Sequence, residues 1–341
     1  MNRNHENNIT KKINNNPIIH YKTEYDKLSK LEKITLKNKV NKIIKLFRNY
    51  HRKKDLSTLT STRINSSNNH DNTNYNQNNT SIQFIGTKDK MGRKKGFGIQ
   101  KWNNGSKFIG LFINDQANSW GIYIHSYGDI YKGQFLNDKT NGYGEYHQDN
   151  IAEYKGYWLN DNQNGIGYEL WNDSSNYKGE YVLGKKEGIG TYKWKDNTMY
   201  QGEWKNNKID GWGIYKFSNG KKYIGRWKKN KMEGYGECFY IDGKKYFGFY
   251  KKDKKCGFGI FYWPENKLYV GFWKEGKQDG YGKFILAKKE KFGIWKNGKK
   301  EKWFKNSEEF FNSLNGIYSN YAKFFKWNLE EINDFFQNDE K

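Results

Sequence analysis

Pairs of glycines in the pattern Gly-x-Gly are the first residues of this 341-residue chain that could do chemistry, because glycine-rich loops cradle phosphate groups. The pattern recurs along the chain, with one degenerate copy at Ser119 and Gly121. No copy extends to GxGxxG or to GxxxxGK[ST], and each lies between a polar turn and a short aromatic run. We therefore predict a structural role for these glycines and no phosphate or cofactor site.

Other residue types with catalytic or metal-binding potential are scattered. The six histidines share no repeat position, and Cys238 and Cys256 form no CxxC pair. Two free thiols suit a reducing cytoplasm, with a disulfide as the alternative. The acidic residues Asp138, Asp161, Asp210 and Asp279 recur where turn chemistry favours aspartate. The sequence thus predicts no catalytic residue, no metal site and no enzyme.

Basic residues form the sharpest functional candidate. The net charge is +24, and residues 201–300 hold 25 basic against 10 acidic groups. Each lysine near an anionic leaflet contributes ~1 kcal/mol of binding, so the clusters could form one basic edge that holds anionic phospholipid or a protein partner. The open alternative is a solvated edge, charged to prevent aggregation. The candidate residues are Lys221, Lys222, Arg226, Lys228, Lys229, Lys231, Lys244, Lys245, Lys251, Lys252, Lys254 and Lys255.

Two residue patterns repeat every 23 positions and stay in phase with each other. The first is aromatic-x-Gly-x-aromatic, which includes Phe108-Ile-Gly110-Leu-Phe112 and later Tyr131, Gly133, Tyr154, Gly156, Trp158, Tyr177, Gly179, Tyr200, Gly202, Trp204, Tyr223, Gly225, Trp227, Tyr246, Gly248, Tyr269, Gly271 and Trp273. The second is Gly-x-Gly, at Gly96/Gly98 and then at Gly142, Gly144, Gly165, Gly167, Gly188, Gly190, Gly211, Gly213, Gly234, Gly236, Gly257, Gly259, Gly280 and Gly282.

Polar turns separate the aromatic runs, so each repeat reads as strand–turn–strand–turn. The predicted fold is mainly β: an elongated, twisted antiparallel sheet of about nine tandem hairpins over residues 84–300. We expect each glycine to leave room for an aromatic ring to lie over the backbone. The aromatics, 18% of the chain, should form the core, and a minority could line an exposed groove for a partner helix or peptide.

The flanking segments differ in composition from the repeats. Residues 1–20 and 56–83 are Asn-rich and predicted to be disordered, while residues 21–55 predict a basic amphipathic helix for a membrane or a partner. Residues 301–341 predict short helices that could cap one sheet edge. One starts at Ser307 and places Phe310, Leu314, Tyr318, Tyr321 and Phe325 on one face, and Asn328 to Glu331 could cap another. Residues 1–10 lack an apolar run, and no stretch is long and apolar enough to span a bilayer.

The unit Tyr-x-Gly-x-Trp, polar turn, Gly-x-Gly resembles the MORN (membrane occupation and recognition nexus) repeat, most closely at residues 200–213, YQGEWKNNKIDGWG. The resemblance covers about residues 84–300 and implies a stacked-hairpin sheet. It also implies a cytoplasmic, non-enzymatic scaffold or adaptor that binds proteins, self-associates and lies at membrane- or cytoskeleton-linked structures.

Three alternatives to the scaffold function accompany the resemblance. A peripheral binder of anionic phospholipid such as phosphoinositide is the first, and an axonemal component similar to radial-spoke proteins is the second. Some MORN arrays are fused to phosphatidylinositol-phosphate kinases or lysine methyltransferases, but the segments that flank this array are too short for either domain. Nucleic acid is not the expected partner, because no base-reading module is visible.

Overall fold

The computed structural model describes residues 83–287, 289–328 and 330–332. The predicted Asn-rich segment at 1–20, the basic helix at 21–55 and the linker up to residue 82 lie outside the described residues. The described chain divides into two units, one ending at Gly144 and one starting at Glu145. Each unit is described by itself.

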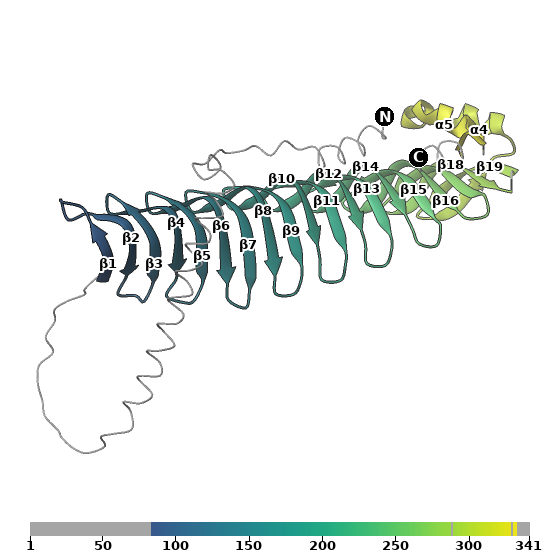
Figure 1. Cartoon of the computed structure of the whole chain (residues 1–341). Coiled ribbons are helices and arrows are strands. Elements are labelled where there is room, and N and C mark those ends of the chain that lie inside the picture. The colour runs from purple at the N-terminus through teal and green to yellow at the C-terminus, as the bar shows by residue number, and fades with distance from the viewer. Residues whose placement is uncertain (1–82, 288, 329, 333–341) are drawn as a thin grey trace, which may run out of the picture. The chain divides into compact units, whose positions relative to one another are not determined.

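Short β-strands make up nearly all of both units (Figure 1). Those of the first unit are β1 (Gln83–Lys88), β2 (Lys94–Lys101), β3 (Lys107–Ile113), β4 (Gln116–Ile124) and β5 (Ile130–Leu136), and β6 (Lys139–Gln148) runs across the division. Those of the second unit are β7 (Ala152–Leu159), β8 (Asn162–Trp171), β9 (Asn176–Val182), β10 (Lys185–Lys193), β11 (Met199–Lys205), β12 (Lys208–Lys216), β13 (Lys222–Lys228), β14 (Lys231–Phe239), β15 (Lys245–Lys251), β16 (Lys254–Trp263), β17 (Lys267–Lys274), β18 (Lys277–Leu286), β19 (Lys289–Lys296) and β20 (Lys299–Trp303).

Consecutive strands pair antiparallel, from β1 to β5 in the first unit and from β7 to β20 in the second. The glycines of the two repeat patterns face each other across the pairs, as in Gly202↔Gly213 and Gly213↔Gly225. The predicted fold of tandem antiparallel hairpins is confirmed. The strands start one residue before the predicted array and continue to Trp303.

The tight turn of each hairpin also links it to the hairpin before. Asn206 and Asn207 have φ of 49° and 62°, the two left-handed residues of a type I′ turn. The Asn207 Oδ1 atom accepts a hydrogen bond of 2.7 Å from the Lys186 backbone N–H, and Asn230 does the same for Ile209 at 2.7 Å. Asn and Asp recur here because they tolerate positive φ and offer this acceptor.

The repeat glycines serve two different purposes. A Cβ on Gly202 or Gly213 would overlap the Tyr200 side chain and nearby backbone, so no other residue fits there. The predicted packing role is right for these positions. The first glycine of Gly-x-Gly differs, because it takes positive φ, as at Gly211 with 115°. Ser119 replaces this glycine in the degenerate copy and also has positive φ, at 64°.

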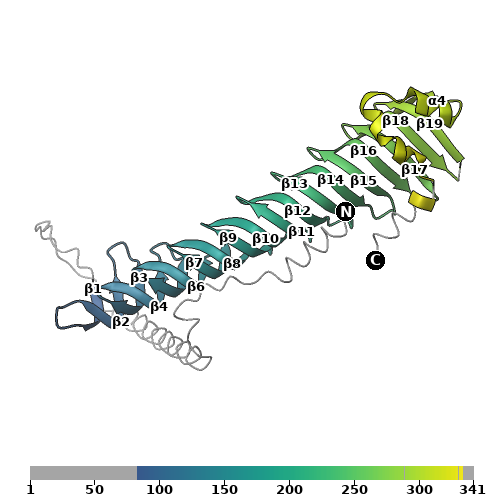
Figure 2. The same cartoon turned by 90° about the horizontal axis from the view of Figure 1, so that it is seen from above.

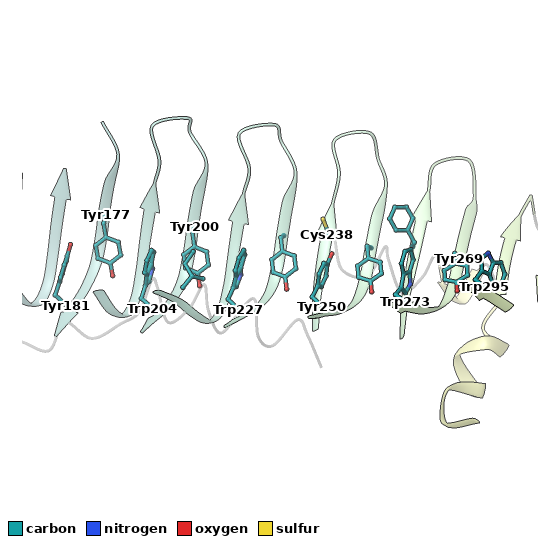
Figure 3. Packing of buried hydrophobic residues seen from close by; sticks show 14 of the residues in the cluster. Tyr177, Tyr181, Tyr200, Trp204, Trp227, Cys238, Tyr250, Tyr269, Trp273 and Trp295 are labelled. Atoms are coloured by element: carbon teal, nitrogen blue, oxygen red, sulfur yellow. The ribbon is translucent and has the colours of Figure 1, made fainter. Parts of the chain in front are cut away.

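Tyrosines that lie over these glycines form the core of the second unit (Figure 3). Tyr200 is fully buried, and its hydroxyl donates a hydrogen bond of 3.0 Å to the Glu203 carbonyl oxygen. Its ring meets Trp204 and Trp227 edge-on, with centroids 5.5 and 5.8 Å apart. The same tyrosine-to-backbone bond recurs at Tyr154, Tyr177, Tyr223, Tyr246 and Tyr269.

Helical segments after the strands cover the opposite face of the sheet near its C-terminal end. They are α4 (Ser307–Ser313), the 3-10 helix η1 (Gly316–Tyr321) and α5 (Ala322–Lys326), and α4 lies beside β18 and β19 in Figures 1 and 2. Phe258 on β16 stacks against Tyr321 at 4.8 Å, and Phe292 on β19 packs on Phe310 at 4.8 Å.

The structure confirms the predicted C-terminal helices but corrects their continuity and their placement. Leu314 is extended and Gly316 has φ of 51°, so the expected single stripe from Phe310 to Phe325 is divided among three short helices. The helices cover a face of the sheet and not an edge. The predicted cap at Asn328 is present: the Glu331 N–H donates to Asn328 Oδ1 at 2.8 Å, and the Asn328 N–H donates to Glu331 Oε2 at 2.7 Å.

Candidate binding groove and basic surfaces

An aromatic groove runs along the tyrosine face of the second unit and has a volume of about 850 Å³. Its walls come from β8 to β14 and from the turns between them. The side chains of Trp194, Tyr215 and Phe217 are half-buried, so part of each ring remains open to a ligand. The other lining residues include Trp171, Tyr192, Trp204, Ile209, Trp227 and Met232.

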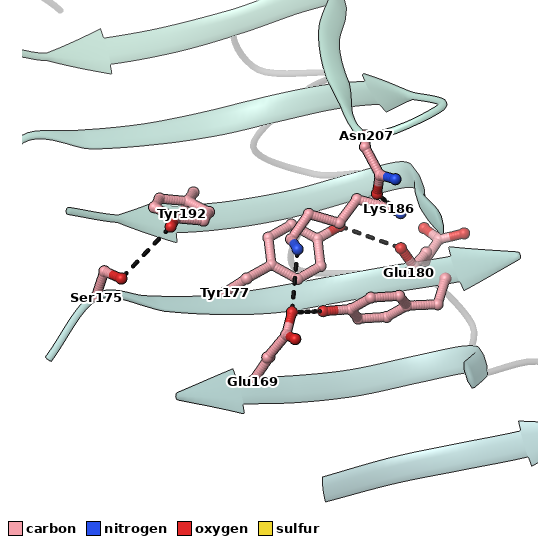
Figure 4. A network of polar contacts seen from close by, with 8 residues as sticks. Glu169, Ser175, Tyr177, Glu180, Lys186, Tyr192 and Asn207 are labelled. Carbon is pink, nitrogen blue, oxygen red and sulfur yellow. Dashed lines mark hydrogen bonds and ion pairs between the residues drawn. The ribbon is translucent and has the colours of Figure 1, made fainter. Parts of the chain in front are cut away.

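A charged station lies at one end of the groove (Figure 4). The Lys186 Nζ atom is 3.0 Å from Glu169 Oε2, and the Tyr181 hydroxyl donates to the same oxygen at 2.8 Å. The Lys186 and Glu169 side chains are only 14% and 17% exposed. Lys186 also lies over the Trp171 ring, 4.7 Å from its centroid. This pair is screened from water far more than a surface ion pair.

A second station holds Cys238, Tyr250 and Lys255, three repeats further along. The Lys255 ammonium lies 4.3 Å from the Phe261 centroid and 5.0 Å from that of Trp273. Burial, with a smaller contribution from the charge of Lys221, lowers the pKa of Lys255 to about 8. Burial also raises the pKa of the Cys238 thiol. Figure 3 shows Cys238 beside the Tyr250 hydroxyl.

The structure distributes the predicted lysine surface over several places, so the expected single basic edge is wrong. Lys221, Lys222, Lys244 and Lys245 lie where the chain passes from one hairpin to the next. Lys228, Lys229, Lys231, Lys251, Lys252 and Lys254 are exposed at the opposite edge, around the tight turns. Arg226 lies exposed within β13, and Lys255 is half-buried among aromatic rings. Whether any of these residues binds lipid or protein stays a prediction.

The tight-turn edge carries a pattern that sequence reasoning missed. In five successive hairpins, the last cross-strand pair before the turn consists of two lysines, and like charges directly opposite each other destabilise a sheet. The pairs are Lys205↔Lys208, Lys228↔Lys231, Lys251↔Lys254, Lys274↔Lys277 and Lys296↔Lys299. This lysine-pair edge, as we call these ten residues, runs through the second unit. The sequence signal was present, as lysines three positions apart in phase with the glycines.

Sequence reasoning also missed the Glu169–Lys186 station, although Glu169 breaks the aromatic pattern of its repeat position. Within the described residues, no group of three or more His, Cys, Asp or Glu side chains is placed to hold a metal ion. None of the described helices has the length and apolar character needed to cross a bilayer.

Comparison with known proteins agrees with the geometry of the hairpins. The model of the MORN repeat family matches residues 90–107, 131–150, 154–175, 177–199, 200–222, 223–245, 246–266 and 269–289. No curated protein matches the chain.

Among solved structures, the TCP10 domain of Danio rerio CPAP is 14% identical with a TM-score of 0.31, and the match covers 55% of this chain and 86% of that domain. The SAS-4 TCP domain of Drosophila melanogaster, solved with a proline-rich motif of Ana2, is 13% identical with a TM-score of 0.26, covering 60% and 98%. These likenesses are too weak to support any inference about function. The family match is different, because its eight segments span half of the chain and fall on the hairpins described above; the chain belongs to the MORN-repeat family, a non-catalytic repeat module.

Proposed function

We propose that the protein is a scaffold or adaptor that binds protein segments in the aromatic groove of its second unit and acts at membrane- or cytoskeleton-linked structures in the cytoplasm. The groove carries this proposal. It combines half-buried tryptophan and tyrosine rings with a few polar groups at its ends, the composition found at the energetic centres of protein interfaces. Its volume of about 850 Å³ suits several residues of a peptide.

Self-association belongs to the same proposal. Strand β20 pairs with β19 on one side, and its five residues are exposed. Such an edge strand offers backbone groups to another chain, although its lysines oppose close pairing. Light scattering of the purified full-length chain over a concentration series tests this part, and a constant monomer mass would contradict it.

A groove substitution tests the scaffold function. The change Trp194→Ala removes a half-buried ring, and Tyr168→Ala is the matched control, because Tyr168 lies on the other face of the sheet and is 37% exposed. Proximity labelling in the protein's own cell should lose a set of neighbours with Trp194→Ala and keep them with Tyr168→Ala. Identical labelling for the two variants would remove the groove as the docking site.

Peripheral binding of anionic phospholipid is the second candidate, and the lysine-pair edge favours it. These lysines flank turns, not an unpaired strand, so protection against edge-to-edge aggregation does not explain them. Five lysines near an anionic leaflet would contribute about 5 kcal/mol in all. The one ion pair here, Lys254–Glu275, is exposed on both sides and offsets little of this charge.

Vesicle sedimentation tests the lipid candidate. We expect the protein to pellet with phosphatidylserine vesicles, less at higher salt, and not with phosphatidylcholine vesicles. Reversing Lys228, Lys231, Lys251 and Lys254 to Glu should abolish pelleting. Reversing four exposed lysines elsewhere in the unit, Lys178, Lys193, Lys195 and Lys216, controls for net charge. Equal loss with both sets would reduce the effect to bulk charge, and no pelleting of the wild type would reject the candidate.

A further inference from the structure

The two stations of the second unit are formed by the same three positions of the repeat. Three repeat positions break their pattern together at both places, 69 residues or three repeats apart. The position of Glu169 and Cys238 otherwise holds Tyr or Phe from Tyr123 to Phe284. In the second unit, the repeat position of Lys186 and Lys255 holds Gln163, Ile209, Met232 and Gln278 in the other repeats, and the first unit has one further lysine there, Lys94. Tyrosine replaces Trp or Phe only at Tyr181 and Tyr250.

The first station is complete in charge and hydrogen bonding. Its Glu169 carboxylate accepts hydrogen bonds from Tyr181 at 2.8 Å and from Lys186 at 3.0 Å, so the buried cation has its counter-ion within the chain. Buried charges persist in proteins when they are paired in this way.

The second station keeps the tyrosine and the lysine but lacks the carboxylate. Cys238 replaces the glutamate, and its thiol stays neutral at pH 7 because burial raises its pKa. Lys221 adds a second cation: its ammonium lies 5.4 Å from the Tyr240 ring centroid, and that of Lys255 lies 5.7 Å from it. No ion pair of the described residues includes either lysine. With no carboxylate to hold it, Lys255 lies over the rings of Phe261 and Trp273.

The second station adjoins the groove through Phe217. The Lys221 ammonium lies 4.6 Å from the centroid of Phe217, which lines the groove, and Phe217 is only half-buried. A peptide in the groove can therefore extend an acidic side chain toward Lys221 and Lys255.

We propose that Lys221, Tyr250 and Lys255 form a seat for the carboxylate of a Glu or Asp side chain from a partner peptide that lies in the groove. This inference rests on the proposed docking function and gives its ligand a chemical class. The bound carboxylate takes the place that Glu169 fills in the first station: it accepts from the Tyr250 hydroxyl and neutralises Lys255. Two observations favour an acidic peptide over an uncharged one: the positive charge of Lys221 and Lys255, and the equivalent first station, where Glu169 pairs with Lys186.

A substitution that places a carboxylate at the second station tests, without any ligand, whether the proposed seat accepts a carboxylate. The variant Cys238→Glu should recover much of the thermal stability that its neutral isostere Cys238→Gln loses, so its Tm should be the higher of the two at pH 7. Adding Lys255→Met to both variants should erase this difference. A lower Tm for Cys238→Glu than for Cys238→Gln would show that the site rejects a carboxylate and would overturn the proposal.

Binding of defined peptides tests the ligand class. Two pools of nine-residue peptides, random except for a fixed central Glu or a fixed central Gln, are compared for retention on the full-length protein. We expect about tenfold stronger retention of the Glu pool by the wild type, the effect of one charge-assisted contact. The preference should vanish in Lys255→Met and in Cys238→Glu and remain in Lys193→Met, which removes an exposed lysine from the other face of the sheet.

The outcomes separate the seat from the groove. Equal retention of both pools that is lost in Trp194→Ala would keep the docking function and overturn the seat. No retention of either pool would overturn both. A Glu preference that survives Cys238→Glu would assign the acidic ligand to another lysine and also overturn the proposal, as would pelleting with phosphatidylserine vesicles that depends on Lys255.

Discussion

Each repeat tyrosine of the second unit is held by the residues it covers. The ring of Tyr200 crosses Gly202 and Gly213, and its hydroxyl donates to the Glu203 carbonyl oxygen. The buried hydroxyl is therefore satisfied by the backbone, without a polar side chain as its partner. Because backbone lies directly beneath the ring, neither glycine can gain a methyl group unless the tyrosine moves.

The glycines that the rings cover should be the most sensitive residues of the repeat. We expect Gly213→Ala to lower the free energy of unfolding by about 3 kcal/mol or more, since the added Cβ overlaps a ring fixed on several sides. Gly276→Ala is the control for backbone strain without a steric overlap: Gly276 has φ of 82°, a positive value that Gly213 lacks, but open space around it, so it should lose only about 1–2 kcal/mol. Urea unfolding measures both. A loss for Gly213→Ala no larger than that for Gly276→Ala would show that the Tyr200 ring does not confine Gly213.

The buried lysine of the second station should give stability an unusual pH dependence. The pKa of Lys255 is about 8 in the folded protein and 10.5 in the unfolded chain. Between these values the unfolded state binds more protons, so this residue adds stability as pH rises from about 8 to about 10.5. The variant Lys255→Met lacks this contribution, and the stability of the wild type relative to it should increase between pH 7 and pH 10.

Taking the difference between the two proteins isolates the lysine from other groups. Burial raises the pKa of Cys238 and of the repeat tyrosines such as Tyr246. Each of these groups therefore lowers the free energy of unfolding as the pH rises above the pKa that the group has in the unfolded chain. The tyrosine losses are common to the wild type and the variant. The Cys238 loss is not, because the charge of Lys255 lowers the pKa of that thiol, so both proteins are compared in a Cys238→Ala background. A difference in unfolding free energy that stays constant with pH would show that Lys255 is solvated in the folded protein.

At this scale the sequence predicts the tyrosines and glycines but not the stations. The period of 23 residues identifies which residues are equivalent, and hairpin geometry then places the rings over the glycines. The period shows which residues of other repeats are equivalent to Lys255. It does not show in which direction a long, flexible lysine side chain points. From the sequence, Lys255 is therefore grouped with exposed lysines, whereas the structure places its ammonium over the rings of Phe261 and Trp273.

At the scale of elements, the C-terminal helices explain why the last strands carry aromatic side chains on both faces. Phe258 and Phe272 would face water without them, and both pack on Tyr321, with centroids 4.8 and 5.1 Å away. Lys283 is fully buried there and donates to Glu290 at 3.0 Å and to the Trp327 carbonyl oxygen. These polar contacts orient the helices on the sheet.

Weakening the helix contacts should release this segment while the strands stay folded. Phe310 is fully buried among Phe292, Phe304 and Phe325, so Phe310→Ala should cost about 3–5 kcal/mol of docking free energy. Limited proteolysis should then cut between residues 305 and 332, and binding of a hydrophobic dye should increase. Ile317→Ala, at a side chain that is 64% exposed, should change neither. Protease resistance of Phe310→Ala would contradict the assigned packing.

The sequence predicts that these helices exist but not how they break. Helical spacing from Phe310 to Phe325 favours one continuous helix, and local pattern carries no information about the sheet beneath. The chain bends at Leu314 and Gly316 so that its aromatics reach Phe258, Phe272 and Tyr281, which lie on different strands. Tertiary packing outweighs local helix propensity here.

At the scale of the molecule, each strand of the second unit contacts mainly the strands next to it in the chain. Stability in such arrays is close to a sum over repeats and their interfaces. Hydrogen exchange of Gly213→Ala should therefore show lost protection in β11 to β13 and nearly normal protection in β17 and β18. Uniform loss throughout the unit would mean that it unfolds as one cooperative block.

Asn207, Asn230 and Asp253 each accept a hydrogen bond at the turn from a backbone N–H 21 residues earlier, in the hairpin before. This spacing has a consequence for how the protein can change over generations. A tandem duplication or deletion of 23 residues leaves every donor with an acceptor of the same kind. The gene can thus lengthen or shorten the array in whole repeats at little folding cost, and a repeat gained or lost between the two stations changes the distance from the acidic-ligand seat to the Glu169 pair. The spacing between binding sites on such an array therefore changes by whole repeats of 23 residues.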